Sequence, residues 1–250
     1  MIKEALEYIV GMSKANVQDI TLADGTIQTY SDKPLRRLEK HIPMVDETIH
    51  MSTLTSLVDY IKGNVDAMAE KMIIQVVDPE TAVLFSCLNE ERDREKMVVV
   101  NAKVPDFPFN SFMDQEKFCI NLQSKFIGGE VDPGTDLELV LKFAGTVKAG
   151  TVAEYGDDGV TQKATVKTGI ASMEDAIVPN PVSLRPYRTF LEVKQPESDF
   201  IFRMKQDKYD GILCAIFEAD GGAWKIAATS AIKDYLVSEL SDCPQFTIIS

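Results

Sequence analysis

The chain has 250 residues, 45% of them hydrophobic and 26% charged, and its formal net charge is −13 at pH 7. This length suits two small domains or one large α+β domain, and the ordinary composition predicts a folded, soluble protein rather than a disordered one. Nucleic-acid backbones and anionic membranes repel so acidic a chain, so we expect no direct DNA binding and no membrane contact.

The first elements expected along the chain are a helix and a hairpin. Residues 2–15 place apolar side chains on one helical face and charged side chains on the other. Asp24-Gly25 separates two alternating runs, which is the signal of a β-hairpin over 17–30. Residues 31–47 contain two prolines and are expected to form a connector.

A second helix is expected from Ser52 to Lys62. Ser52 or Thr53 can cap its first turn, and Gly63 can end it. Its predicted inward face is apolar and consists of Leu54, Leu57, Val58 and Ile61.

Three strands and a further helix are expected next, over 72–78, 81–88, 96–102 and 112–129. The segment 128–136 (GGEVDPGTD) is rich in glycine and proline, as linkers often are. We therefore expect an N-terminal α+β domain over 1–130 and a β-rich C-terminal domain over 131–250.

The C-terminal half is expected to be mostly β. A helix over 136–147 precedes a hairpin over 151–169 around Asp157-Asp158-Gly159. Further extended segments or strands are expected over 178–186, 189–193, 199–206, 211–219 and 223–229, before a final helix over 229–240. Because hairpin turns outnumber helical crossovers, the fold class is α+β with mainly antiparallel sheets and a few flanking helices.

The cysteines and the N-terminus favour a cytoplasmic protein. Cys87, Cys119, Cys214 and Cys243 include no C-x-x-C pair, which excludes a zinc ribbon and argues against a disulfide framework. The first residues lack the apolar core of a signal peptide, and no stretch approaches the ~18 apolar residues that cross a bilayer.

The sequence contains no strong catalytic or metal-binding motif. Phosphate-binding loops, nucleophile elbows and zinc-protease motifs are absent, and the two histidines, His41 and His50, are read as surface residues. Glu218 and Asp220 in FEADGGAW have a spacing that could hold a divalent ion or divide acid and base roles. A tight turn explains Asp220-Gly221-Gly222 more simply. We therefore expect no catalytic residue, no metal and no cofactor.

Residues 183–203 (SLRPYRTFLEVKQPESDFIFR) contain three arginines in an acidic chain. These arginines could converge if two strands pair across Gln195-Pro196, and guanidinium groups beside aromatic rings suit a phosphate with a stacked base. The alternative is that each arginine pairs with a carboxylate on the sheet surface. The expected ligand-binding residues are Arg185, Tyr187, Arg188, Phe190, Arg203 and Trp224.

Two segments carry a resemblance to a known family. PNPVSLRPYRTFLEVKQPESDFIFRM, followed by AIFEADGGAWKIAA, resembles the phage and prophage family of unknown function typified by the YfdQ protein. The matching elements lie at 184–203 and 217–224, and TLTSLVDYIKGN in the N-terminal half is similar more loosely. The resemblance implies a phage origin and a role in the cytoplasm of the bacterial host, and it implies no known reaction.

Two functional classes follow, with a third left open. The first is a non-enzymatic binding protein that takes up a small anionic nucleotide-like ligand, and so sequesters a nucleotide-derived immune signal of the host. The second is an accessory protein of phage recombination or replication that acts through protein contacts. The third is a metal-dependent nucleotide hydrolase that uses Glu218 and Asp220. We expect the first, and we expect a homo-oligomer because a sheet-rich chain has several edge strands.

Overall fold

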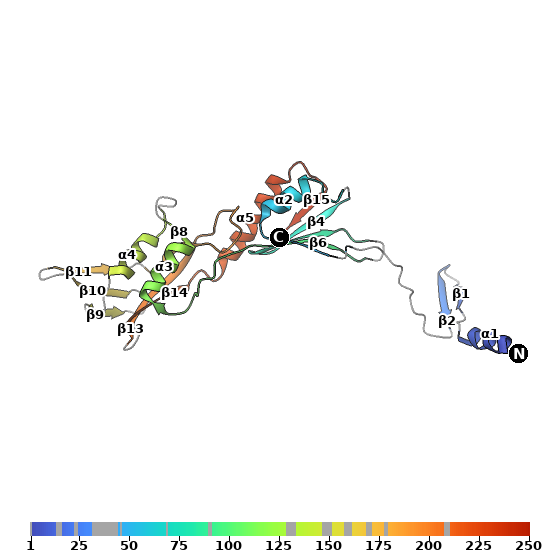
Figure 1. Cartoon of the computed structure of the whole chain (residues 1–250), viewed down its shortest axis with the longest axis horizontal. Coiled ribbons are helices and arrows are strands. Elements are labelled where there is room, and N and C mark those ends of the chain that lie inside the picture. The colour runs from blue at the N-terminus through green and yellow to red at the C-terminus, as the bar shows by residue number, and fades with distance from the viewer. Residues whose placement is uncertain are drawn as a thin grey trace. The chain divides into compact units, whose positions relative to one another are not determined.

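The computed structural model of the chain divides into two compact units, Met1–Met44 and Val45–Ser250 (Figure 1). A few helices separate longer runs of strands along the chain, and most strand pairs are antiparallel, which confirms the α+β class. The structure describes residues 2–13, 17–22, 25–31, 45, 47–68, 70–89, 92–128, 134–146, 152–157, 162–168, 172–177, 180–207 and 211–250.

The first unit contains the expected helix and hairpin. Helix α1 spans Ile2–Ser13, and β1 (Val17–Thr21) pairs antiparallel with β2 (Ile27–Ser31). Gly25 has a φ of 83°, a conformation that glycine adopts readily and that lets the chain reverse. Asp24, the other expected turn residue, lies outside the described residues.

The second unit begins with a five-stranded sheet, here called the first sheet. Its order is β15-β4-β5-β6-β3. The central strands β4 (Met72–Asp78), β5 (Thr81–Ser86) and β6 (Lys96–Asn101) confirm the three expected strands. The sequence reading missed the outer strands β3 (Ile49–Met51) and β15 (Phe246–Ile249), which are short and pair parallel with their neighbours.

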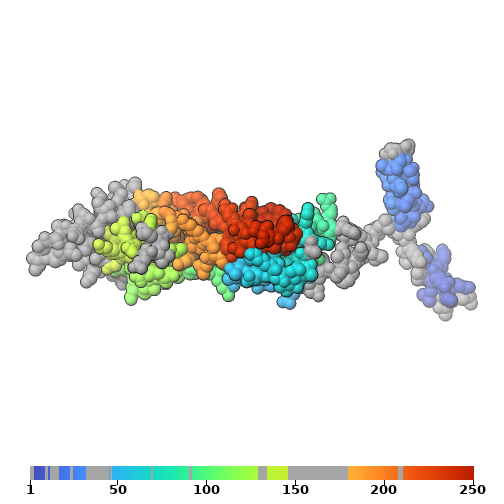
Figure 2. All heavy atoms as spheres, turned by 90° about the horizontal axis from the view of Figure 1, so that it is seen from above, coloured from blue at the N-terminus to red at the C-terminus, as the bar shows by residue number. Residues whose placement is uncertain are grey.

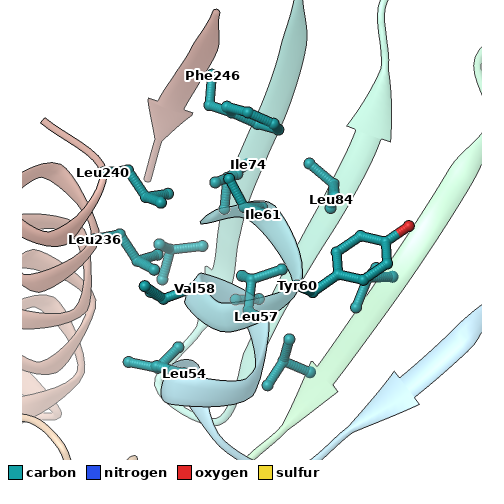
Figure 3. Packing of buried hydrophobic residues seen from close by; sticks show 14 of the residues in the cluster. Leu54, Leu57, Val58, Tyr60, Ile61, Ile74, Leu84, Leu236, Leu240 and Phe246 are labelled. Atoms are coloured by element: carbon teal, nitrogen blue, oxygen red, sulfur yellow. The ribbon is translucent and has the colours of Figure 1, made fainter. Parts of the chain in front are cut away.

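Two helices cover one face of the first sheet and enclose a hydrophobic core. Helix α2 (Leu54–Lys62) begins after Thr53, whose hydroxyl accepts a hydrogen bond from Ser56 N, and it lies beside α5 (Ala223–Glu239) (Figure 2). Figure 3 shows the core that forms between them and the sheet. Its labelled members include all four residues of the predicted α2 face, together with Ile74, Leu84, Leu236, Leu240 and Phe246.

A second five-stranded sheet, here called the second sheet, has the order β7-β14-β13-β12-β8. Its strands are β7 (Met113–Asp114), β8 (Phe126–Ile127), β12 (Val182–Pro186), β13 (Ser198–Asp207) and β14 (Gly211–Glu218). Helices α3 (Gln115–Lys125) and α4 (Leu137–Thr146) contribute to an aromatic core against it, in which Phe143 and Phe202 meet edge to face at 6.0 Å. Helix α3 is shorter than predicted because its flanking residues become the edge strands β7 and β8.

The hairpin expected over 151–169 is present as β9 (Val152–Asp157) and β10 (Gln162–Thr168). A third strand, β11 (Ser172–Ile177), pairs antiparallel with β10 and was not predicted. The expected turn residues Asp158 and Gly159 lie outside the described residues.

The strand order does not follow the expected boundary after residue 130. The second sheet combines β7 and β8 with β12–β14, and the first sheet combines β3–β6 with β15. Both sheets therefore take strands from each side of residue 130, and the compact units divide instead between Met44 and Val45. None of the helices within the described residues is long and apolar enough to span a membrane.

Candidate functional site

Residues 187–197 form a loop, which we call the 187–197 loop. The prediction of a strand over 189–193 is therefore wrong. The buried Gln195 side chain lies inside this loop and forms hydrogen bonds with its backbone. Its Oε1 accepts hydrogen bonds from Arg188 N (3.0 Å) and Thr189 N (3.2 Å), and its Nε2 donates to Phe190 O (2.9 Å). One amide thus satisfies backbone groups that a strand would pair with a neighbour.

The 187–197 loop is anchored to the first sheet and to α2. Thr189 Oγ1 donates to Pro79 O at 2.5 Å, in the turn between β4 and β5. Glu192 Oε1 accepts from Thr55 N at 3.1 Å in the first turn of α2. Phe190, only 2% exposed, packs with Val193 in the core of the first sheet. Phe190 is therefore a core residue rather than the expected ligand contact.

Trp224 lies in the first turn of α5, where the sequence reading expected a strand over 223–229. That expectation is wrong because the chain turns into a helix at two glycines with left-handed backbone, Gly221 (φ 63°) and Gly222 (φ 83°). The Asp220 carboxylate accepts from Gly222 N (3.0 Å) and Trp224 N (3.3 Å), which satisfies two amides at the helix start.

The surroundings of Asp220 lower its pKa. Burial acts to raise the pKa, but hydrogen bonds from Gly222 N, the Ser198 hydroxyl and Trp224 N outweigh it, helped by the Arg188 charge. Asp220 is thus held as the carboxylate that caps α5.

Arg188 is the most unusual residue of the region, because it is charged and only 5% exposed. Its Nη1 donates to Glu218 Oε1 at 2.9 Å, and its Nη2 donates to the Ser198 hydroxyl. The guanidinium lies 4.1 Å from the centre of the Trp224 ring, and also close to Phe200 and Phe109 at 5.4 and 5.7 Å. Contacts of this kind between an arginine and the face of an aromatic ring are attractive.

Burial lowers the pKa of Arg188 to about 10, although Glu218 and Asp220 act to raise it. The guanidinium therefore remains a cation at neutral pH. Its Nε is buried and has no hydrogen-bond partner among the described residues.

A cleft of about 410 Å³ opens beside this arginine, and we call it the Arg188 cleft. Its volume falls within the range of ligand sites. Three expected site residues, Tyr187, Arg188 and Trp224, line it together. The sequence reading missed further lining residues from distant segments, among them Glu80, Phe109, Lys125 and Lys225.

Arg185 lies in a neighbouring groove of about 350 Å³, which it lines with Ile127, Tyr187, Leu191, Val193 and Lys194. Its Nη2 donates to Glu197 Oε2 at 2.5 Å. The pKa of Glu197 is lowered, first by a hydrogen bond from Ser183 and then by Arg185. For Arg185, the structure shows the carboxylate pairing that was the alternative to a ligand contact.

The structure does not bring the three arginines together. On β13, Phe200 pairs with Glu218 of β14, and these two residues share the face that Arg188 contacts. Arg203 is an odd number of residues from Phe200 and pairs with Ala215, so it projects from the opposite face. The expected convergence of Arg203 with Arg188 is therefore wrong.

The two carboxylates of FEADGGAW have separate structural partners. Glu218 forms the ion pair with Arg188, and Asp220 caps α5. In the described part of the chain, no three histidine, cysteine, aspartate or glutamate side chains are grouped so that they could hold a metal ion.

Comparisons of this chain with family models, with curated proteins and with solved structures found no match.

Proposed function

We propose that the chain is a phage-encoded, non-enzymatic binding protein, and that its Arg188 cleft takes up a small anionic nucleotide-like ligand. The observation that carries the proposal is the stack of the buried Arg188 guanidinium on Trp224, 4.1 Å apart, at the wall of a cleft of ligand size. A rigid cation beside an aromatic ring suits a phosphate joined to a planar base.

Other residues that line the cleft also suit a ligand that combines an aromatic ring with negative charge. Tyr187 and Phe109 add rings, and Lys125 and Lys225 add positive charge. Arg188 and Glu218 partly offset each other's charge. A phosphate placed near Lys225, which is exposed at the start of α5, would also meet the positive end of the helix dipole.

The biological setting is proposed from the resemblance to the YfdQ family at 184–203 and 217–224. A phage protein that binds such a ligand without changing it would sequester a nucleotide-derived immune signal in the bacterial cytoplasm. Glu218 forms an ion pair with Arg188, and Asp220 accepts hydrogen bonds at the start of α5. Because both carboxylates already have structural partners, the site supports binding rather than hydrolysis.

A thermal-shift screen with ADP-ribose and cyclic dinucleotides tests the proposal. A ligand at 100 times its dissociation constant should stabilise the protein by about 2.7 kcal/mol. Lys225→Ala should reduce the shift, whereas Lys233→Ala, farther along α5, should leave it unchanged. Ligand released by denaturation should be chromatographically intact. A converted product would indicate an enzyme, and the absence of any shift would refute binding of these ligands.

A protein-binding accessory role remains the second proposal, and one observation favours it. Leu191 of the 187–197 loop and Ile226 of α5 are 71% and 76% exposed, although Gln195 and Asp220 fix the backbone near each. Exposed apolar side chains can form part of a protein–protein contact surface. Capture of a purified phage recombinase by the wild-type protein, but not by Leu191→Asp, with no nucleotide shift, would favour this role.

A further inference from the structure

A second cavity lies next to the Arg188 cleft. It is the groove of about 350 Å³ that Arg185 lines, and we call it the Arg185 groove. Tyr187 contributes to the lining of both the groove and the cleft, so its side chain lies between the two cavities. The two cavities are therefore neighbours that share part of a wall.

The cavities follow one another along the paired strands β8 and β12. In the groove, Arg185 pairs with Ile127 by strand register. Two residues farther along the chain, Tyr187 N donates to Lys125 O at 2.9 Å, and Lys125 lines the cleft. Two residues of a strand span about 7 Å. A phosphate linkage between two sugars can bridge a step of this size.

The charge of the Arg185 groove is opposite to that of the whole chain. Within the described residues, the lining of the groove contains two cations, Arg185 and Lys194, and no aspartate or glutamate. The chain as a whole has a net charge of −13. Glu197 lies outside the lining and forms an ion pair with Arg185, so these two partly offset each other's charge. The exposed Lys194 adds a further positive charge, and the lining therefore suits an anionic group.

Aliphatic side chains form much of the remaining lining of the groove. Leu191 is 71% exposed, Ile127 is half-buried and Val193 is buried. Apolar linings with a few placed polar groups are typical of ligand sites, and the volume of the groove falls within their range. The groove therefore offers room for a second base or sugar, and not for a phosphate alone.

We propose that the Arg185 groove and the Arg188 cleft form one two-part site, and that its ligand is a dinucleotide, in which two nucleoside halves are joined through phosphate. One half lies on Trp224 in the cleft, the other lies on Leu191 in the groove, and Lys194 binds phosphate. This inference rests on the proposed function and narrows its ligand to one with two nucleoside halves. Linking the halves makes the second binding event intramolecular, which strengthens binding.

Calorimetric titration of the full chain tests the two-part site. Cyclic di-AMP, cyclic di-GMP, cyclic GMP–AMP and NAD are compared with AMP and GMP. We expect at least one dinucleotide to bind at least about tenfold more tightly than either mononucleotide. Lys194→Ala should weaken that dinucleotide about two- to fivefold and leave mononucleotide affinity unchanged. The matched control Lys96→Ala removes an exposed lysine of β6 and should change neither affinity.

A second variant puts a negative charge into the groove at an exposed position. Leu191→Asp should weaken dinucleotide binding at least about tenfold, whereas Val65→Asp, at a position that is 66% exposed, should not. Dinucleotides that bind no more tightly than mononucleotides would overturn the two-part site. So would a dinucleotide affinity that is the same in Leu191→Asp and Val65→Asp. Either result would leave nucleotide binding in the cleft intact, whereas a protein that binds no nucleotide at all would refute the proposed function itself.

Discussion

Arg188 shows how one side chain can hold several elements while it lines a cleft. Its guanidinium joins Glu218 of β14 to Ser198 of β13 and stacks on Trp224 of α5. A buried arginine is tolerated only where opposite charge and hydrogen bonds compensate its desolvation. Because these partners fix its position, a ligand would meet a cation that needs no reorganisation.

Gln195 should matter more for stability than its type suggests. In Gln195→Ala, the buried amides of Arg188 and Thr189 lose their acceptor, and the free energy of unfolding should fall by roughly 2–4 kcal/mol. Denaturation by urea measures this loss. Gln206→Ala, at an exposed position of β13, should change the stability by less than about 0.5 kcal/mol. Similar losses in both variants would contradict the account of the loop.

The raised pKa of Glu80 predicts that anion binding in the Arg188 cleft depends on pH. Partial burial, and then the nearby Asp78 carboxylate, raise the pKa of Glu80, so this group takes up a proton at higher pH than an ordinary glutamate. The cleft therefore loses a negative charge as the pH falls through the raised pKa of Glu80, and ADP-ribose should bind more tightly at acidic pH than at neutral pH. Calorimetric titration should show this gain in the wild type and a weaker pH dependence in Glu80→Gln. An equal gain in both would exclude Glu80 as its source.

At the scale of elements, the Asp220 cap determines where Trp224 lies. Asp220→Ala removes the acceptor of two amides at the start of α5 and should cost about 1 kcal/mol of stability. Trp224 is the only tryptophan, so its emission reports the change directly. Asp234→Ala, an exposed position of the same helix, should leave the emission unchanged. An unshifted spectrum in Asp220→Ala would contradict the capping role.

The elements that were predicted correctly are those with local signals. Periodicity and capping residues indicated α2, and alternation with turn residues indicated β4–β6 and the hairpins. The segments 189–193 and 223–229 also alternate, but neither forms a strand. Hydrogen bonds from the Gln195 side chain hold the first segment in a loop, and two glycines with left-handed backbone start a helix at the second. Strands β3 and β15 depend on parallel partners far away in the sequence, which local patterns do not reveal.

The candidate site was predicted only in part for the same reason. Tyr187, Arg188 and Trp224 stand in conspicuous polar-aromatic stretches, and they do line one cleft. Lys125 and Glu80 reach that cleft from the end of α3 and from the turn after β4, and no motif marks either residue. Arg203 was misplaced because side-chain direction depends on strand register, which the turn at Gln195-Pro196 did not fix.

At the scale of the whole molecule, Phe190 links the two sheets of the second unit. It projects from the 187–197 loop, between β12 and β13 of the second sheet, into the core of the first sheet. Phe190→Ala should cost about 3–5 kcal/mol and separate the melting of the two sheets into two transitions, where the wild type should show one. Scanning calorimetry measures both effects. Leu191→Ala, next to it but 71% exposed, should retain the single transition.

Binding in the Arg188 cleft is the central claim, and Trp224 fluorescence tests it most directly. Titration with ADP-ribose and cyclic dinucleotides should quench or shift the emission saturably for at least one ligand, because the single tryptophan lines the cleft. Lys225→Ala should weaken that response, and Lys233→Ala should not. Emission that stays constant with every nucleotide, in a protein whose fold is intact, would contradict the claim.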